Sequence, residues 1–150
     1  SGIAKVYQDL ALIPLMSVAL NFWLGRELTK KVGPITVMDF EKCNSILMSE
    51  MDKIGIKLRD PSQSIGTLSG GERQTVAISR AVYFGAEILI LDEPTSALDS
   101  VTGREIVSLL KRLAIEQNCS VLMVTHDPRI LDVADRLLKM EDGRLIHSVG

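Results

Sequence analysis

Long hydrophobic runs are missing from this sequence. No apolar stretch approaches the roughly 20 residues that a bilayer-spanning helix needs. The most apolar segment, residues 10–16, is short and is interrupted by Pro14. The start of the chain also lacks the pattern of a secretory signal. We therefore expect any role at a membrane to come through a partner.

Paired cysteines are absent as well. Only Cys43 and Cys119 are present, far apart, and neither belongs to a Cys-x-x-Cys pair. We expect both to be small buried hydrophobic residues in a reducing cytosol. A disulfide or a metal site is the less favoured alternative.

Positive charge is not in excess. The formal net charge is -2, from 17 Lys and Arg against 19 Asp and Glu. Affinity for a nucleic-acid backbone needs clustered Lys and Arg. We therefore expect no nucleic-acid partner.

What is present is an alternation of apolar segments with turn residues, in 150 residues that suit one domain. From Leu68 onward the order strand, helix, strand, helix indicates an α/β layer around a parallel sheet. Residues 87–91 are almost wholly apolar, so we expect this strand to be buried on both faces. The predicted strands are residues 2–8, 87–91 and 120–124, the helices 17–25, 36 or 39 to 54, 72–84, 102–116 and 128–134, and a hairpin turns at Asp142-Gly143.

The segment Leu68-Ser69-Gly70-Gly71-Glu72 stands at the start of a predicted helix. Glycines let the backbone approach a ligand closely. The free N–H groups and the dipole of a helix start favour an anion, and the serine adds a hydroxyl donor. A glycine pair also marks any tight turn. With Ser before it and Glu-Arg-Gln after it, we interpret this segment as a phosphate contact.

Two acids, Asp92 and Glu93, end the apolar strand. In open α/β sheets, ligands bind beyond the carboxyl ends of the strands. Asp92 is placed to hold Mg²⁺, directly or through water. Glu93 is then placed to polarise an attacking water as a general base. The alternative is a solvated acidic turn.

A histidine, His126, follows the next predicted strand together with Thr125. Both predicted strands end at the same edge of a parallel sheet, so His126 is expected beside Asp92 and Glu93. We expect it to contact a γ-phosphate or a water and, when neutral, to orient Glu93. A purely structural histidine is the alternative.

In order along the chain, these segments resemble the nucleotide-binding domain of ABC transporters. Residues 68–71 match its signature motif, with Glu72 where the family more often has Gln. Residues 88–92 resemble the Walker B strand, and Glu93 takes the catalytic-base position. His126 resembles the switch histidine, residues 96–99 match the D-loop, and residues 7–9 resemble the Q-loop.

The resemblance covers essentially the whole chain, and it is uneven. Residues 7–97 look most like the ATPases of sugar importers, whereas residues 99–146 look more like those of exporter-type or lipoprotein-releasing systems. The transported substrate and the direction of transport therefore stay open at this point.

The resemblance implies an α/β fold, with part of a P-loop NTPase (RecA-like) core, a parallel sheet and a helical subdomain. The divisions it predicts are a Q-loop strand and loop over residues 1–16, a helical, signature-bearing subdomain over 17–71 and a C-terminal catalytic core over 72–150. It implies ATP and Mg²⁺ as ligands, with Gln8 reaching the metal and the water.

The resemblance also implies two partners. One is a second ATPase domain, in a homo- or heterodimer, whose nucleotide would meet Ser69, Gly70, Gly71 and Glu72 and whose interface would include Asp99. The other is a transmembrane permease subunit, docked on the helical subdomain. The chain would then be cytoplasmic and peripheral, at the inner face of the cell membrane.

One family motif has no counterpart in these 150 residues. The phosphate loop, Gly-x-x-x-x-Gly-Lys followed by Ser or Thr, is not found, and in the family it precedes the Q-loop. Without it the backbone cradle and the Lys for the β- and γ-phosphates are lacking. We expect the isolated chain to bind ATP weakly and to hydrolyse it negligibly. Missing strands should also expose apolar edges and favour self-association or strand exchange.

Two other functions compete with a transporter motor. A non-catalytic module with the family's shape would explain the missing loop. A non-transport ABC ATPase of the chromosome-organising or DNA-repair kind would place long coiled coils between Q-loop and signature, and no sustained heptads occur there.

Overall fold

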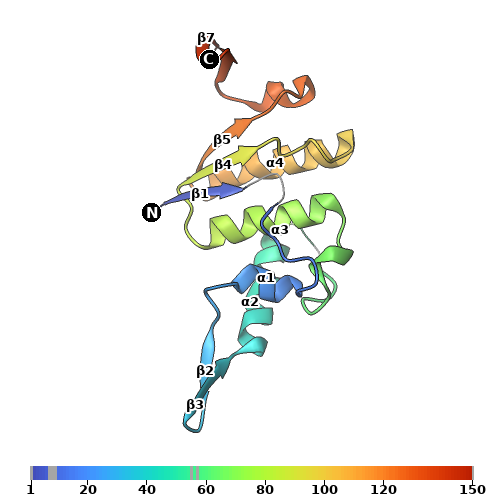
Figure 1. The fold of residues 1–150 in the computed structure, drawn as a ribbon, viewed down its shortest axis with the longest axis vertical. Helices are drawn as coiled ribbons and strands as arrows, with labels where there is room; N and C mark the ends of the chain where they lie inside the picture. The colour runs from blue at the N-terminus through green and yellow to red at the C-terminus, as the bar shows by residue number, and fades with distance from the viewer. Residues whose placement is uncertain (1, 7–9, 55, 57, 150) are drawn as a thin grey trace.

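A three-stranded parallel sheet organises the upper half of the molecule in Figure 1. The computed structural model describes residues 2–6, 10–54, 56 and 58–149. Within them the sheet has the order β1-β4-β5, formed by β1 (Ile3–Val6), β4 (Ile88–Asp92) and β5 (Ser120–Val124). The register pairs Val6 with Leu91 and Asp92 with Val124. The predicted α/β fold with a parallel sheet is confirmed.

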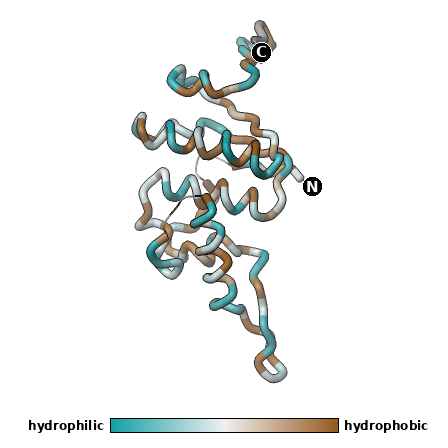
Figure 2. The backbone as a smooth tube through the Cα atoms, turned by 180° about the vertical axis from the view of Figure 1, so that it is seen from behind, coloured by the Kyte–Doolittle hydropathy of each residue, from teal (hydrophilic) through white to brown (hydrophobic). Residues whose placement is uncertain are grey.

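One face of this sheet is covered by two helices, α3 (Gly70–Tyr83) and α4 (Ser100–Glu116). Both are amphipathic, and Figure 2 shows apolar and polar positions alternating along them. Their apolar stripes pack with the sheet into one buried cluster, made by Val6, Ala77, Ile78, Leu89, Leu91, Ile106, Leu109, Leu110, Leu113 and Cys119. The helices thus hold β4 firmly in place.

The expectation that the β4 strand is buried on both faces is wrong. Leu89 and Leu91 are fully buried, but Ile88 on the opposite face is 38% exposed. Because α3 and α4 share one side, no helix among the described residues covers the other side. The neighbouring side chains Ile3 and Leu122 are more than half exposed there.

A helical lobe forms the lower half in Figure 1. It contains α1 (Val18–Trp23), α2 (Phe40–Lys53) and the 3-10 helix η1 (Ile65–Thr67). Ser17 caps α1 by accepting a hydrogen bond from the Leu20 N–H, as predicted. The Trp23 indole is buried and donates to the Cys43 carbonyl at 3.0 Å. This bond fixes α1 against α2.

A hairpin between α1 and α2 was not predicted. Strands β2 (Thr29–Val32) and β3 (Ile35–Met38) pair antiparallel and project away from the lobe (Figure 1). Their turn contains Gly33 at φ +62°. Asp39 then caps α2, so the later of the two predicted helix starts is right and Thr36 lies in β3.

Helix α3 belongs to both halves. Val76 packs into the cluster of the helical lobe, while Ala77 and Ile78 pack under the sheet. The Arg80 guanidinium donates to the carbonyls of Phe22 and Leu24 at the end of α1. The predicted division at residues 71 and 72 remains a prediction, and the packing of α3 runs across it.

The last elements follow the sheet without joining it. After the 3-10 helix η2 (Pro128–Val133), β6 (Leu137–Glu141) and β7 (Arg144–Val149) form a separate antiparallel pair. Asp142 and Gly143 have φ of +47° and +73°, which confirms the predicted turn. Among the described residues both cysteines are free and buried, as expected. None of the described helices combines the length and apolarity that crossing a bilayer requires.

Candidate functional site

The carboxyl ends of β4 and β5 bring the predicted acids and histidine together. Asp92 is the last residue of β4, and Glu93 follows it. Thr125 and His126 follow β5 directly. Because the strands are parallel neighbours, all of these residues lie at one edge of the sheet. The predicted proximity of Glu93 and His126 is confirmed.

The backbone of Glu93 is held in an unusual conformation. Its φ of +46° lies in the left-handed region, which non-glycine residues seldom occupy. The Glu93 N–H donates to the Val124 carbonyl at 2.9 Å, and the Ser96 hydroxyl donates to the Glu93 carbonyl at 3.0 Å. Such strain persists only where the surroundings impose it, and it clusters at functional sites.

The Glu93 carboxylate accepts three hydrogen bonds from the end of β5. Its Oε1 lies 2.7 Å from His126 Nδ1 and 3.0 Å from the His126 N–H, and Oε2 lies 3.3 Å from the Thr125 hydroxyl. Because the carboxylate accepts, Nδ1 carries the proton in this pair. The Glu93 side chain is 21% exposed and that of His126 is 83% exposed. The glutamate is thus fixed and half-buried, while the outer imidazole nitrogen faces solvent.

Asp92 is the candidate metal ligand at this edge. It is exposed and adjoins Glu93, and its oxygens are of the type that Mg²⁺ prefers. The described residues contain no group of three or more potential protein ligands. Mg²⁺ commonly takes one or two carboxylates and completes its shell with water and phosphates. A single carboxylate at this position fits that mode.

The start of α3 is built as a capping box. Ser69 Oγ accepts from the Glu72 N–H at 3.3 Å, and Glu72 Oε2 accepts from the Ser69 N–H at 2.8 Å. The Ser69 hydroxyl, followed by the Ser69 N–H, lowers the pKa of Glu72. Among the described residues, no hydrogen bond takes up the N–H groups of Gly70 or Gly71. These two backbone donors remain available for an anion.

The glycines of this segment also serve packing. A Cβ at Gly71 would lie 2.4 Å from Thr102 Cγ2, and one at Gly70 would lie 3.1 Å from Leu98 Cδ2. Helix α3 therefore approaches the start of α4 as closely as it does only because Gly71 has no side chain. Sequence reasoning assigned the glycines to a ligand, with a tight turn as the alternative, and missed this contact.

Replacing Gly71 with alanine is expected to lower the free energy of unfolding by about 1–3 kcal/mol, the usual penalty for overpacking. Thr102 cannot turn its methyl away without losing the bond from its hydroxyl to Asp99, at 2.7 Å. Gly103→Ala is the matched control, because its new Cβ meets Thr95 at an ordinary 3.4 Å. Urea unfolding followed by circular dichroism measures both, and equal losses would contradict the packing argument.

Of the two remaining predicted residues, the structure describes Asp99 but not Gln8. Asp99 caps α4 by accepting from the N–H groups of Val101 and Thr102, and these bonds, with the Thr102 hydroxyl first, lower its pKa. Gln8 lies outside the described residues. Within the described ranges no hydrogen bond or ion pair joins Ser69 to Glu93 or His126. The roles assigned to Gln8, Ser69, Gly70, Gly71, Glu72, Asp92, Glu93, Asp99 and His126 in binding and catalysis remain predictions.

Sequence reasoning missed an ion pair just after His126. Asp127 Oδ1 accepts from the Arg129 N–H at 3.0 Å and from its Nε at 2.8 Å, and Oδ2 accepts from Nη2 at 2.7 Å. Arg129 also donates to the hydroxyl of Ser100 at the start of α4. The pair ties the segment after His126 to α4. An Asp before Pro at a helix start was the available signal.

The Asp127 carboxyl is expected to make stability fall at low pH. The Arg129 side chain, followed by the Arg129 N–H, lowers its pKa to about 2, against roughly 3.9 in an unfolded chain. Its contribution is thus complete above about pH 4 and is lost as pH falls toward about 2. When the urea midpoint of unfolding is plotted against pH, Asp127→Asn should make the curve flatter between about pH 4 and pH 2. Parallel profiles for the two proteins would contradict the assignment.

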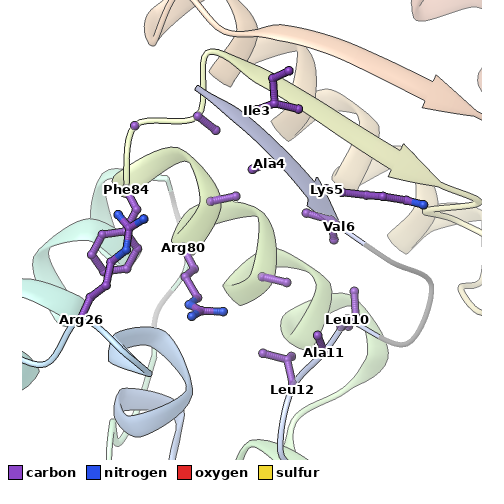
Figure 3. A pocket seen from close by; sticks show the side chains of 14 residues that line it. Ile3, Ala4, Lys5, Val6, Leu10, Ala11, Leu12, Arg26, Arg80 and Phe84 are labelled. Carbon is purple, nitrogen blue, oxygen red and sulfur yellow. The ribbon is translucent and has the colours of Figure 1, made fainter. Parts of the chain in front are cut away.

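A second concave site lies where the helical lobe meets β1. Its volume is about 220 Å³. Figure 3 shows Arg26 and Phe84 at one end and Leu10 to Leu12 at the other. The Arg26 guanidinium lies 4.7 Å from the centre of the Phe84 ring. Burial, with Arg26 adding to it, lowers the pKa of Arg80. This surface combines apolar walls with three cations, Lys5, Arg26 and Arg80.

Known proteins are similar in sequence to this chain over most of its length. The model of the ABC transporter family matches residues 1–96. The xylose/arabinose import ATP-binding protein of Sulfolobus acidocaldarius is 38% identical over 97% of this chain and 56% of its own length. The fructose import ATP-binding protein of Rhizobium meliloti is 34% identical over 91% of this chain and 54% of its own.

Solved structures of ATP-binding proteins share the fold of this chain. The ATP-binding cassette MJ0796, a dimer bound to ADP and phosphate, has a TM-score of 0.74 and 29% identity, covering 99% of this chain and 63% of its own. The cbiO1 protein of Clostridium perfringens is part of an ABC transporter complex. It has a TM-score of 0.78 and 27% identity, and the match covers 98% of this chain and 56% of the cbiO1 chain. The chain thus spans little more than half the length of proteins that match it almost throughout. It belongs to the ABC transporter family, as part of the ATP-binding domain.

Proposed function

We propose that this chain forms the signature-bearing and base-bearing part of an ABC-type ATPase that drives transport across a membrane. The observation that carries the proposal is the Glu93–His126 pair, joined at 2.7 Å beyond the carboxyl ends of two parallel strands. A strained, half-buried carboxylate next to an exposed histidine suits a base for an attacking water. The family's coupling of ATP hydrolysis to transport supplies the biological context.

The residues at the carboxyl ends of β4 and β5 have distinct proposed roles. Glu93 accepts the proton of the attacking water. His126, which donates to Glu93 through Nδ1, directs its other ring nitrogen toward the γ-phosphate. Asp92 would hold Mg²⁺, which neutralises phosphate charge when bound. From the resemblance alone, Gln8 would reach the metal and the water.

The start of α3 has a proposed role in a neighbouring subunit. Its capping box leaves the N–H groups of Gly70 and Gly71 without a protein acceptor in the described structure. These donors and the positive end of the helix dipole suit a phosphate anion. We assign them to the nucleotide of a second ATPase domain, with Asp99 at the same interface. The dimeric cassette among the similar structures supports this assembly.

A permease subunit is the second proposed partner. Its docking face is the helical lobe, and the concave site lined by Leu12, Arg26, Arg80 and Phe84 gives that face an apolar, cationic recess. Such a partner would place the chain at the inner face of the cell membrane. The relatives named above import pentoses or fructose, so we propose a sugar as the class of cargo.

The decisive experiment supplies the missing phosphate loop. The segment preceding the matched region in the Sulfolobus relative, fused to Ser1, gives a chimera with every family motif. We expect the chimera to hydrolyse ATP and the 150-residue chain alone to show none, because positioning of the phosphates is nearly all of phosphoryl-transfer catalysis. Turnover by the chain alone, or a folded chimera that binds ATP without turnover, would contradict the proposal.

A non-catalytic module is the second candidate. In this alternative the chain keeps the family's shape and acts through contacts with a partner. Under this alternative the chimera would bind a partner domain and leave ATP intact, so the same assay separates the two.

A further inference from the structure

A chain of hydrogen bonds runs from the carboxylate of Glu93 to the start of α4. Glu93 Oε2 accepts from the Thr125 hydroxyl at 3.3 Å, and the Thr125 hydroxyl oxygen accepts from the Asp127 N–H at 3.0 Å. The Asp127 carboxylate accepts from Arg129, and Arg129 donates in turn to the hydroxyl of Ser100. The candidate base is therefore connected to a long helix by residues that follow β5.

The Arg129 guanidinium makes the two outer connections of this chain with one rigid group. Its Nε and Nη2 donate to the two oxygens of Asp127 at 2.8 and 2.7 Å, while Nη1 donates to Ser100. Because the donors of a guanidinium are fixed in one plane, such a bidentate pair sets the orientation of the carboxylate as well as its distance. We call the three residues Asp127, Arg129 and Ser100 the Arg129 bridge.

The bridge ends on a fixed point, because α4 is held by its packing. Ser100 is the first residue of this helix, directly after its cap Asp99. The apolar side of α4 packs into the cluster under the sheet through Ile106, Leu110 and Leu113, each no more than 3% exposed. Close-packed interiors resist displacement of their elements. Arg129 therefore fixes Asp127 relative to the body of the protein.

The segment between β5 and η2 depends on such a tether. Residues 125–127 belong to no helix or strand. Thr125 and His126 nevertheless supply the three hydrogen bonds that hold the Glu93 carboxylate. A general base must lie within hydrogen-bond reach of its water, and a displacement of about 1 Å can cost roughly 100-fold in rate. Movement of this segment would therefore move the base.

We propose that Arg129 is a positioning residue for ATP hydrolysis. It fastens Asp127 to α4 and thereby keeps the Thr125 hydroxyl and the His126 N–H on the Glu93 carboxylate. Arg129 itself touches neither nucleotide nor water in this role. The inference rests on the proposed function to the extent that Glu93 is the base.

A second ion pair between the same two elements supplies the matched control. Arg104 on α4 donates through Nη1 to both carboxylate oxygens of Asp132 in η2, at 2.8 and 2.9 Å. Arg129 likewise belongs to η2 and contacts α4. No side-chain hydrogen bond in the described structure joins the Arg104–Asp132 pair to Thr125. If the bridge only fastened η2 to α4, loss of either pair should have the same effect.

The first measurement uses the 150-residue chain without nucleotide. Arg129→Ala is expected to speed the amide hydrogen exchange of His126, whose N–H donates to Glu93 at 3.0 Å, by about tenfold or more. The reason is that the untethered segment opens more often. Arg104→Ala should leave this rate unchanged. Equal acceleration by the two variants, or none by Arg129→Ala, would overturn the inference.

The second measurement is ATP turnover by the chimera. Arg129→Ala should lower kcat by about 10- to 100-fold with little change in KM for ATP, whereas Arg104→Ala should change neither. Arg129→Lys keeps the charge without the planar fork and should restore only part of kcat. Ser100→Ala removes the acceptor on α4, suits a helix, and should lower kcat in the same direction. Faster exchange at His126 with an unchanged kcat would overturn the positioning role.

A double-mutant cycle tests whether Arg129 acts through Thr125. Thr125→Val removes the hydroxyl that joins Glu93 to Asp127, so adding Arg129→Ala to it should cost less than Arg129→Ala alone. Losses that simply multiply would mean that Arg129 acts elsewhere, and would contradict the inference. A chimera without turnover would sink the proposed function, and the exchange rate of His126 would still decide whether the bridge holds the segment on Glu93.

Discussion

Glu93→Gln in the chimera is expected to reduce ATP turnover by about 10²–10⁴-fold, the range typical of losing a general base. The substitution keeps the shape of the side chain and its reach to His126, so binding of ATP should change little. The physical reason is that an amide cannot take a proton from the attacking water. Steady-state phosphate release and equilibrium ATP binding, measured on the same preparation, separate the two effects.

Glu105→Gln provides the matched control for this substitution. Glu105 is an exposed glutamate on α4, and no hydrogen bond or ion pair joins it to Glu93 or His126 in the described structure. Its replacement should leave turnover unchanged. A Glu93→Gln chimera with at least a tenth of the original turnover would rule out Glu93 as the base.

Trp23→Ala is expected to lower the free energy of unfolding by about 3–5 kcal/mol, the usual loss for a buried aromatic. The ring is 1% exposed and packs edge-on against Phe22, Tyr83 and Phe84, with centroids 5.5–5.7 Å away. The Cys43 carbonyl would also lose its indole donor. Circular dichroism in urea measures the loss without depending on tryptophan fluorescence.

Two further variants define what the tryptophan contributes. Trp23→Phe keeps an aromatic ring and removes the indole N–H, so it should lose less than Trp23→Ala. Leu15→Ala changes an apolar side chain that is 93% exposed and should be neutral. A neutral Trp23→Ala would mean that the aromatic cluster does not stabilise the helical lobe.

The part of the site that depends on sheet order was predictable from the sequence. Apolar runs ending in Asp92-Glu93 and in Thr125-His126 predict parallel strands, and parallel neighbours end at a common edge. The proximity of Glu93 and His126 follows from that alone. What the sequence does not reveal is the left-handed backbone of Glu93, because it arises from bonds to Val124 and Ser96 that only the folded turn creates.

The missed features depend on contacts between elements. The β2–β3 hairpin is made of two four-residue strands, of which only β2 contains lysines, and nearly all of their residues are exposed, so no alternation of buried and exposed residues marks it. The open face of β4 looks identical in sequence to its buried face, because Ile88 and Leu89 are equally apolar. The capping box at Ser69 and Glu72 was visible as Ser-x-x-Glu, a pattern that indicates a helix start as well as a ligand contact.

The central claim is that Glu93 and His126 act on one nucleotide while the start of α3 reaches the nucleotide of a neighbouring subunit. Ser69→Asp tests the second half cleanly, because aspartate caps a helix as well as serine does while its charge repels a phosphate. Ser69→Asn, which caps without the charge, is its control. The direct measurement is ATP turnover by an equal mixture of the Glu93→Gln and Ser69→Asp chimeras.

Each chimera alone should be inactive. Random pairing should give heterodimers with one intact site, and the mixture should recover about a quarter of the unsubstituted turnover. If base and signature served the same subunit's nucleotide, every site in the mixture would carry a defect. A mixture as inactive as its two components would therefore contradict the account.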